Sequence, residues 1–151
     1  MSSASCRLRA NRSSERGHHY LLTTCCHLRR PVFLHGRAAG LVLDSAHWLD
    51  RKARLTLIAI MVMPDHVHLV VELREHSLSQ VMHSFKSHTA HAIKKSLRLS
   101  APLWQAGYHD CGIRDELALK ASVEYCLHNP VRAGLVDDFH QHPHYWCRWP
   151  V

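Results

Sequence analysis

Apolar and polar positions in the first half of the chain follow two different periods. Residues 18–26 are rich in aromatic and β-branched types, which favours a strand. Residues 37–50 carry apolar side chains on one stripe at helical spacing, which predicts a helix. Residues 54–63 are almost continuously apolar, which is typical of a strand buried on both faces. After the turn-forming Pro64-Asp65 pair, residues 66–73 predict a strand that forms a hairpin with the preceding one.

The second half of the chain shows helix signals separated by one short strand. Ser77 and Gln80 form a capping-box pattern that opens a long helix with apolar residues at spacings of three and four. Residues 108–113 form a candidate strand. Carboxylates in the first turn indicate a further helix over about 115–128, which we expect Pro130 to end.

This order of elements predicts the fold class. Strand, helix, strand, strand, helix and strand, followed by an extra helix, make an α+β, ferredoxin-like βαββαβ antiparallel sheet with helices on one face. The extra C-terminal helix carries Tyr125. The chain has no internal repeat and no long linker, so we expect one domain over residues 18–151. Residues 1–17, rich in serine and arginine, predict a flexible basic tail.

Charge narrows the class of partner. Lysine and arginine number 19 against 12 aspartates and glutamates, a net charge of +7, which suits a polyanion such as DNA. The longest apolar run is nine residues, too short to span a bilayer, so we expect no membrane partner. With no secretory signal, we expect a cytoplasmic protein with reduced cysteines.

Two histidines on the predicted strand 66–73 are candidate metal ligands. Residues two apart on a strand point to the same side, so His66 and His68 project together while Val67 and Leu69 face the core. The pair could bind one metal ion. Two histidines alternating by chance on a half-exposed strand would give the same pattern, since the chain holds 16 histidines.

A tyrosine in the last predicted helix is the candidate nucleophile. Tyr125 and Asn129 are four residues apart and so share one helix face, while Val123 and Leu127 fall on roughly the opposite side. A core tyrosine would lie among the leucines, and this one does not. Viewed alone, the helix is equally compatible with a surface tyrosine followed by a helix-ending asparagine.

Together the two features suggest a mechanism. A tyrosine hydroxyl is a poor nucleophile at neutral pH, but a divalent cation that polarises a phosphodiester makes its attack feasible. His66, His68 and the amide oxygen of Asn129 would leave coordination positions open for phosphate oxygens. A covalent intermediate would conserve the energy of the phosphodiester bond between cleavage and rejoining.

At these residues the chain resembles a known family. The stretch MVMPDHVHLVVE resembles the HUH motif (histidine, hydrophobic residue, histidine) of the single-tyrosine transposases. YCLHNPVRAGLV is similar to the tyrosine-bearing helix of the REP-associated tyrosine transposases, and FKSHTAHAIK and LWQAGYHDCGIRDE also resemble that subgroup. The resemblance covers residues 20–136, whereas the N-terminal tail does not align and the segment HQHPHYWCRWPV matches only loosely.

The resemblance implies a ferredoxin-like enzyme that cuts single-stranded DNA near a hairpin, leaving a 5′-phosphotyrosine and a free 3′-hydroxyl. It implies Mg²⁺ or Mn²⁺ as the metal and either a monomer or a homodimer as the active form. Carried onto this sequence, Tyr125 is the nucleophile and His66, His68 and Asn129 are the metal ligands. The implied DNA contacts are Lys86, on the basic helix that also carries Lys94, and Arg114 and Arg132, for which helix capping or a surface ion pair is an equal alternative.

Two other functions fit part of the sequence. A catalytically silent module that binds hairpin DNA would show the same charge, basic helix and tryptophans. A histidine-rich metal-buffering protein would show several weak metal sites spread over the chain. The sequence does not select the DNA sequence that is recognised.

Overall fold

A computed structural model describes residues 7–8 and 17–151 of the chain. The predicted flexible tail falls largely on residues 1–6 and 9–16, outside the described residues. Arg7–Leu8 form a short strand, β1. Over the described residues, no helix is both long enough and apolar enough to cross a membrane.

The predicted elements all form, in the predicted order. Their ends lie within about two residues of those expected from the hydrophobic pattern, as is usual for element boundaries. Ser77 caps the long helix as predicted: its hydroxyl accepts from the backbone N–H of Gln80, whose side chain accepts from the N–H of Ser77. The elements are β2 (His19–Cys25), α1 (Gly36–Arg51), β3 (Leu55–Met63), β4 (His66–Leu73), α2 (Leu78–Leu97), β5 (His109–Ile113) and α3 (Glu116–Leu127).

The strands form one antiparallel sheet in the order β1-β5-β2-β4-β3-β6. The four predicted strands occupy its centre in the order β5-β2-β4-β3, which confirms the ferredoxin-like arrangement. β4 is therefore flanked on both sides by other strands, and side chains on it have fixed neighbours in β2 and β3.

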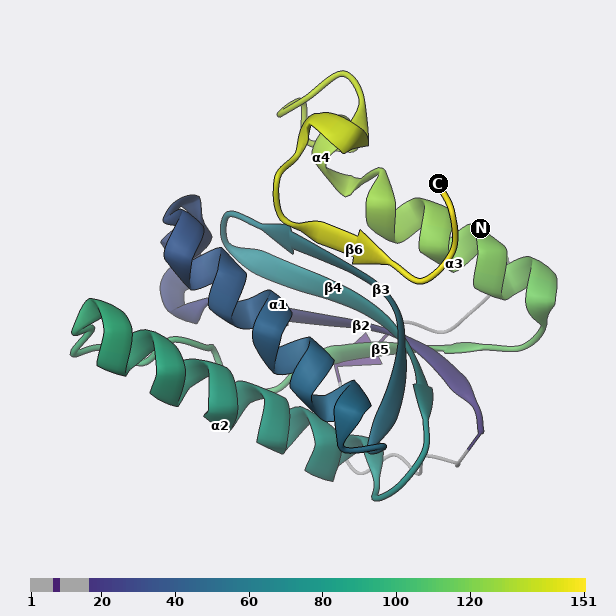
Figure 1. Cartoon of the computed structure of the whole chain (residues 1–151), viewed down its shortest axis with the longest axis horizontal. Helices are drawn as coiled ribbons and strands as arrows, with labels where there is room; N and C mark the ends of the chain where they lie inside the picture. Colours follow the sequence, from purple (N-terminus) through teal and green to yellow (C-terminus); the bar gives the residue numbers. More distant parts are fainter. Residues whose placement is uncertain (1–6, 9–16) are drawn as a thin grey trace.

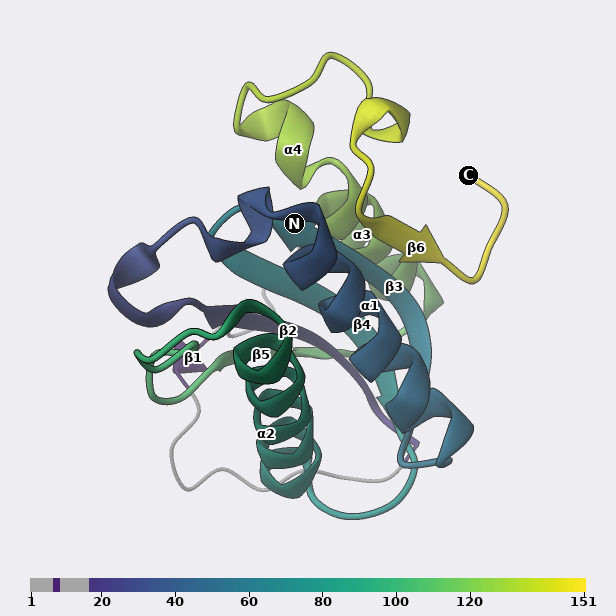
Figure 2. The ribbon, with the colours of Figure 1, turned by 60° about the vertical axis from the view of Figure 1, so that its left-hand side comes forward.

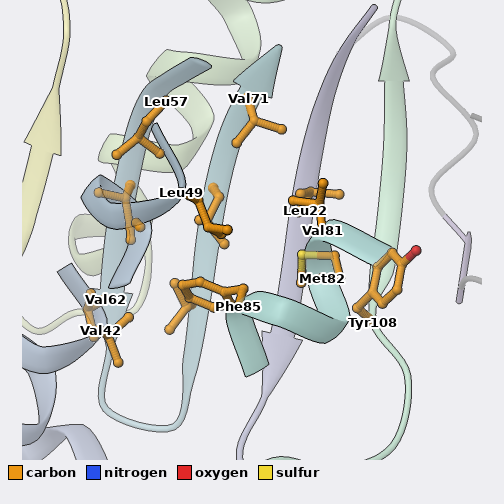
Figure 3. Packing of buried hydrophobic residues seen from close by; sticks show 14 of the residues in the cluster. Leu22, Val42, Leu49, Leu57, Val62, Val71, Val81, Met82, Phe85 and Tyr108 are labelled. Atoms are coloured by element: carbon orange, nitrogen blue, oxygen red, sulfur yellow. The ribbon is translucent and has the colours of Figure 1, made fainter. Parts of the chain in front are cut away.

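α1 and α2 lie side by side over one face of the sheet (Figure 1). A hydrophobic core lies between these helices and the sheet. Phe85 of α2 and Leu49 of α1 belong to it, together with Leu57, Val71 and other sheet residues (Figure 3). Burial of these large side chains is the main source of stability for this layer. This confirms the predicted helix-covered face.

α3 covers part of the other face. Val123, Cys126 and Leu127 of α3 pack against Met61 and Val70 in a second buried cluster. A β-bulge in β3 between Leu57 and Ala59 shifts the register by one residue, so the consecutive residues Ile58 and Ala59 both belong to this second cluster. The tyrosine-bearing helix is thus held on the face opposite to α1 and α2.

The C-terminal segment contains structure that the sequence did not predict. β6 (Tyr145–Cys147) pairs with the edge of β3, and α4 (Asn129–Arg132) follows α3 directly (Figure 2). Pro130 lies inside α4, because a proline in the first turn of a helix loses no intrahelical hydrogen bond. Free thiols occur as expected at four described cysteines, but Cys111 is disulfide-bonded, so that expectation is wrong for Cys111.

Candidate nucleophile and metal site

His66 and His68 project from β4 on the face that α3 covers. Val67 and Leu69 between and beside them enter the core beneath α1 and α2, so the alternation of the strand sends both imidazoles the other way. The two ring centroids are 4.8 Å apart and nearly perpendicular. The structure therefore brings the two predicted ligands together.

His66 is oriented by a carboxylate that is itself held by an arginine. Nδ1 of His66 lies 2.7 Å from Oδ1 of Asp65, and Nε of Arg29, in the short 3₁₀ helix η1 (His27–Arg29), donates to Oδ2 of Asp65 at 2.9 Å. Burial acts to raise the pKa of Asp65, but the hydrogen bonds and positive charges of His66 and Arg29 hold it below its ordinary value. An ionised carboxylate only accepts, so Nδ1 of His66 carries the hydrogen of this contact, which leaves Nε2 as the ring nitrogen that could bind a metal ion.

His68 is kept neutral by its surroundings. Its Nδ1 lies 2.8 Å from the hydroxyl oxygen of Thr23, the residue of β2 that pairs with His68 in the sheet. His68 is only 7% exposed. Burial, reinforced by the positive charges of His66, Arg132 and Arg29, lowers the pKa of His68 from 6.5 to about 3. A neutral imidazole is the form that binds a metal ion.

Tyr125 lies on the exposed rim of α3, next to the histidines. Its ring centroid is 6.1 Å from that of His68 in the same chain, and the residue is 38% exposed. The neighbouring Cys126 is buried and its thiol contacts the backbone oxygen of His68 at 3.7 Å, which anchors this turn of α3 over β4. A solvent-accessible phenol therefore stands beside the two imidazoles.

Arg132 is the basic residue closest to this tyrosine. Its guanidinium carbon lies 3.9 Å from the centroid of the Tyr125 ring, and Nη2 donates to the backbone oxygen of Tyr125 at 2.6 Å. The stacking contact and the hydrogen bond together hold the ring in place, and the guanidinium puts a positive charge beside the phenol.

Asn129 begins α4, one turn beyond Tyr125, and is half-buried. The single helix face predicted for Tyr125 and Asn129 is interrupted, because α3 ends at Leu127 and His128 leaves helical geometry. Among the described residues, no group of three or more histidine, cysteine, aspartate or glutamate side chains converges on one point. A third protein ligand would therefore have to be an oxygen of another type, such as an amide. Two imidazoles that lie together on one side of β4 fit a divalent cation.

The other predicted DNA contacts lie away from the tyrosine. Nζ of Lys86 donates to the backbone oxygens of Gln105 and Gly107, both at 2.8 Å, and so joins α2 to the loop before β5. Lys94 is exposed on α2, across the sheet from the histidines. Arg114 precedes α3 at the end far from Tyr125. Only Arg132 of the four adjoins the candidate site.

Three orienting residues escaped the sequence analysis: Thr23, Arg29 and Asp65. Asp65 directly precedes His66, which was a usable signal for a carboxylate–histidine contact. Thr23 and Arg29 lie more than 30 positions away, and only the pairing of β2 with β4 and the fold of η1 bring them to the histidines.

The chain is similar to known transposases. The sequence matches the family described as "Transposase IS200 like" over residues 14–128. A curated Haemophilus influenzae protein, assigned as a REP-associated tyrosine transposase, is 26% identical over 91 residues, which cover 53% of this chain and 52% of the relative. The chain thus spans about half the length of the curated relative that it matches.

Two solved structures share the fold. One is a REP-associated tyrosine transposase bound to a REP hairpin, with a TM-score of 0.76 and 22% identity, covering 91% of this chain and 81% of the other. The second is a Deinococcus radiodurans protein described as a transposase, with a TM-score of 0.56 and 22% identity, covering 81% of this chain and 97% of the other. These likenesses show the fold of the chain.

Proposed function

The chain belongs to the IS200-like transposase family, and from that premise we propose that it is a metal-dependent tyrosine transposase that nicks single-stranded DNA beside a hairpin. In this proposal Tyr125 is the nucleophile, and His66, His68 and Asn129 hold a Mg²⁺ or Mn²⁺ ion. The observation that carries it is the 6.1 Å approach of the Tyr125 ring to His68 in one chain.

The proposed step is a transesterification. The hydroxyl oxygen of Tyr125 attacks the phosphorus of a phosphodiester and loses its proton to solvent. The bond from phosphorus to the 3′-oxygen breaks, and that oxygen takes up a proton to leave as a free 3′-hydroxyl. The fragment on the 3′ side of the break remains attached to the tyrosine through its 5′-phosphate, and a second 3′-hydroxyl can attack this phosphotyrosine to rejoin the strand without external energy.

The chain supplies the orientation for this step. Asp65 and Thr23 turn the Nε2 atoms of the histidines toward the site, and burial keeps His68 neutral. Arg132 fixes the tyrosine ring and adds a positive charge where negative charge builds up on the phosphate. A bound divalent cation would polarise the phosphate and offset its developing charge.

We propose hairpin DNA as the substrate and the nucleoid of a bacterial cytoplasm as the place of action. The net charge of +7 supports a nucleic-acid partner, as does the fold shared with a structure described as bound to a REP hairpin. In this proposal Arg132 contacts the phosphate that is cut, while Lys94 and Arg114 contact DNA farther away.

We further propose that the site is complete within one subunit, because Tyr125 and His68 of the same chain are in contact distance. Mixing a Tyr125→Phe protein with a His66→Ala protein tests this. The mixture should remain inactive, since neither chain then has both groups. Recovery of nicking in the mixture would show that the tyrosine acts on the partner's histidines.

The nucleophile is tested with a 3′-labelled hairpin oligonucleotide that carries a single-stranded flank, incubated with Mn²⁺. Tyr125→Phe should abolish nicking and the covalent adduct, whereas Tyr145→Phe, a matched loss of one hydroxyl on β6, should leave both intact. Undiminished nicking by Tyr125→Phe would refute the assignment. Salt-dependent hairpin binding without any adduct in the wild type, under either metal, would instead favour the silent binding module.

A further inference from the structure

An open pocket lined by polar residue types lies near the end of β4 that is opposite to His66. It has a volume of about 410 Å³ and is formed by Arg54, which directly precedes β3, and by the start of α2. Ser79, Gln80, His83 and Ser84 recur at helical spacing along one stripe of α2, and His76 lies just before the helix. The nuclease mechanism uses none of these side chains.

The chemistry of the pocket suits an anion. Its lining holds one arginine, two histidines, two hydroxyls and an amide, with no carboxylate. The sequence of α2 contains no aspartate or glutamate, so its positive N-terminal end is not offset by acidic residues of the helix itself. Of the preceding acids, Glu72 forms an ion pair with Arg74 at 3.1 Å, and Glu75 does not line the pocket.

Arg54 is held in place before any ligand binds. Its Nη1 donates to the hydroxyl of Ser84 at 3.1 Å, and its guanidinium carbon lies 5.7 Å from the centroid of the Trp48 ring. Its backbone oxygen also accepts from the N–H groups of Arg74 and Glu75. A guanidinium held on several sides loses little freedom on binding an oxyanion and keeps donors available for it.

We propose that this pocket binds a backbone phosphate of duplex DNA, on a segment other than the one being cut. β4 is an eight-residue strand that runs from His66 to Leu73, so its two ends are about 23 Å apart. α2 also covers the sheet face opposite to the histidines. One phosphate cannot reach both places, but the stem of a hairpin or an adjoining duplex can. The inference rests on DNA being the partner, as in the proposed function.

The test compares two equal charge changes on the same helix. His83 lines the pocket, and His91 is exposed two turns further along α2 outside it. His83→Glu should weaken binding to a blunt 20-base-pair duplex about tenfold and reduce the log–log salt slope by about one phosphate contact. His91→Glu should change the affinity less than threefold. Both positions are exposed, so circular dichroism should show unaltered folding.

Equal losses for the two variants would overturn the pocket and leave only general electrostatic attraction. An Arg54→Gln variant provides a second check and should show the same loss as His83→Glu. If the wild type does not bind the duplex but still forms the tyrosine adduct on a single-stranded flank, this proposal fails and the nuclease stands. If it binds the duplex through His83 but forms no adduct, the nuclease assignment fails and the pocket stands.

Discussion

Replacing Asp65 by asparagine should weaken metal binding while leaving the stability of the fold almost unchanged. Asp65 bonds Nδ1 of His66 at 2.7 Å and accepts from Arg29 at 2.9 Å. The substitution keeps the shape of the side chain but removes the charge that favours the Nδ1–H form and orients the ring. Without that charge, nothing holds the ring hydrogen of His66 on Nδ1, so Nε2 is no longer kept available for a metal ion.

Two magnitudes follow from these contacts. Loss of a group that orients a metal ligand typically lowers metal affinity about 10–100-fold, or about 1.4–2.8 kcal/mol. The ion pair between Arg29 and Asp65 is largely open to water, with side chains 56% and 27% exposed, so its loss costs less than about 1 kcal/mol of folding free energy. We expect a marked loss of metal binding with a small change in the melting temperature.

The assay is a titration of the protein with Mn²⁺ by calorimetry, alongside thermal unfolding. Asp138→Asn is the matched control, because Asp138 bonds Nδ1 of His140 at the same 2.7 Å in an exposed turn. That variant should bind Mn²⁺ as the wild type does. Wild-type affinity in Asp65→Asn, or equal losses in both variants, would refute the orienting role of Asp65.

Three further substitutions test the structural account. Lys86→Met should lower the free energy of unfolding by about 1–3 kcal/mol in a denaturant titration, because two backbone oxygens lose a charged donor; unchanged stability with weakened DNA binding would make Lys86 a DNA contact instead. Phe85→Ala should cost about 3–5 kcal/mol, since Phe85 is fully buried between α2 and the sheet, and a cost below about 1 kcal/mol would argue against this packing. Arg132→Gln should lower the kcat of nicking about tenfold with little change in KM, because the residue positions Tyr125; recovery by Arg132→Lys would show that charge alone suffices.

The parts of the fold that were predictable from the sequence are those governed by local rules. The Ser77–Gln80 capping box fixes the start of α2, and the apolar run before Pro64 marks a strand buried on both faces. His66 and His68 share a side of β4 because strand residues alternate. The order of elements then restricts the sheet to a small set of topologies, of which the ferredoxin-like one forms.

The remaining features depend on contacts between distant segments. β6 has only three residues, and it becomes a strand because the edge of β3 offers it unpaired backbone groups. The family resemblance implied a DNA contact for Lys86, and only the fold shows that its ammonium also donates to the backbone oxygens of Gln105 and Gly107. Helical periodicity gives the face of a residue, not what folds against it.

The most direct test of the tyrosine mechanism is to identify the residue that carries the DNA. The protein is incubated with the flanked hairpin and Mn²⁺, digested with trypsin and nuclease, and analysed by mass spectrometry. Cleavage after Lys120 and Arg132 releases a peptide, residues 121–132, whose single tyrosine is Tyr125. We predict that this tyrosine carries a nucleotide attached through its 5′-phosphate. An adduct on any other residue, or strand cleavage without an adduct, would contradict the account.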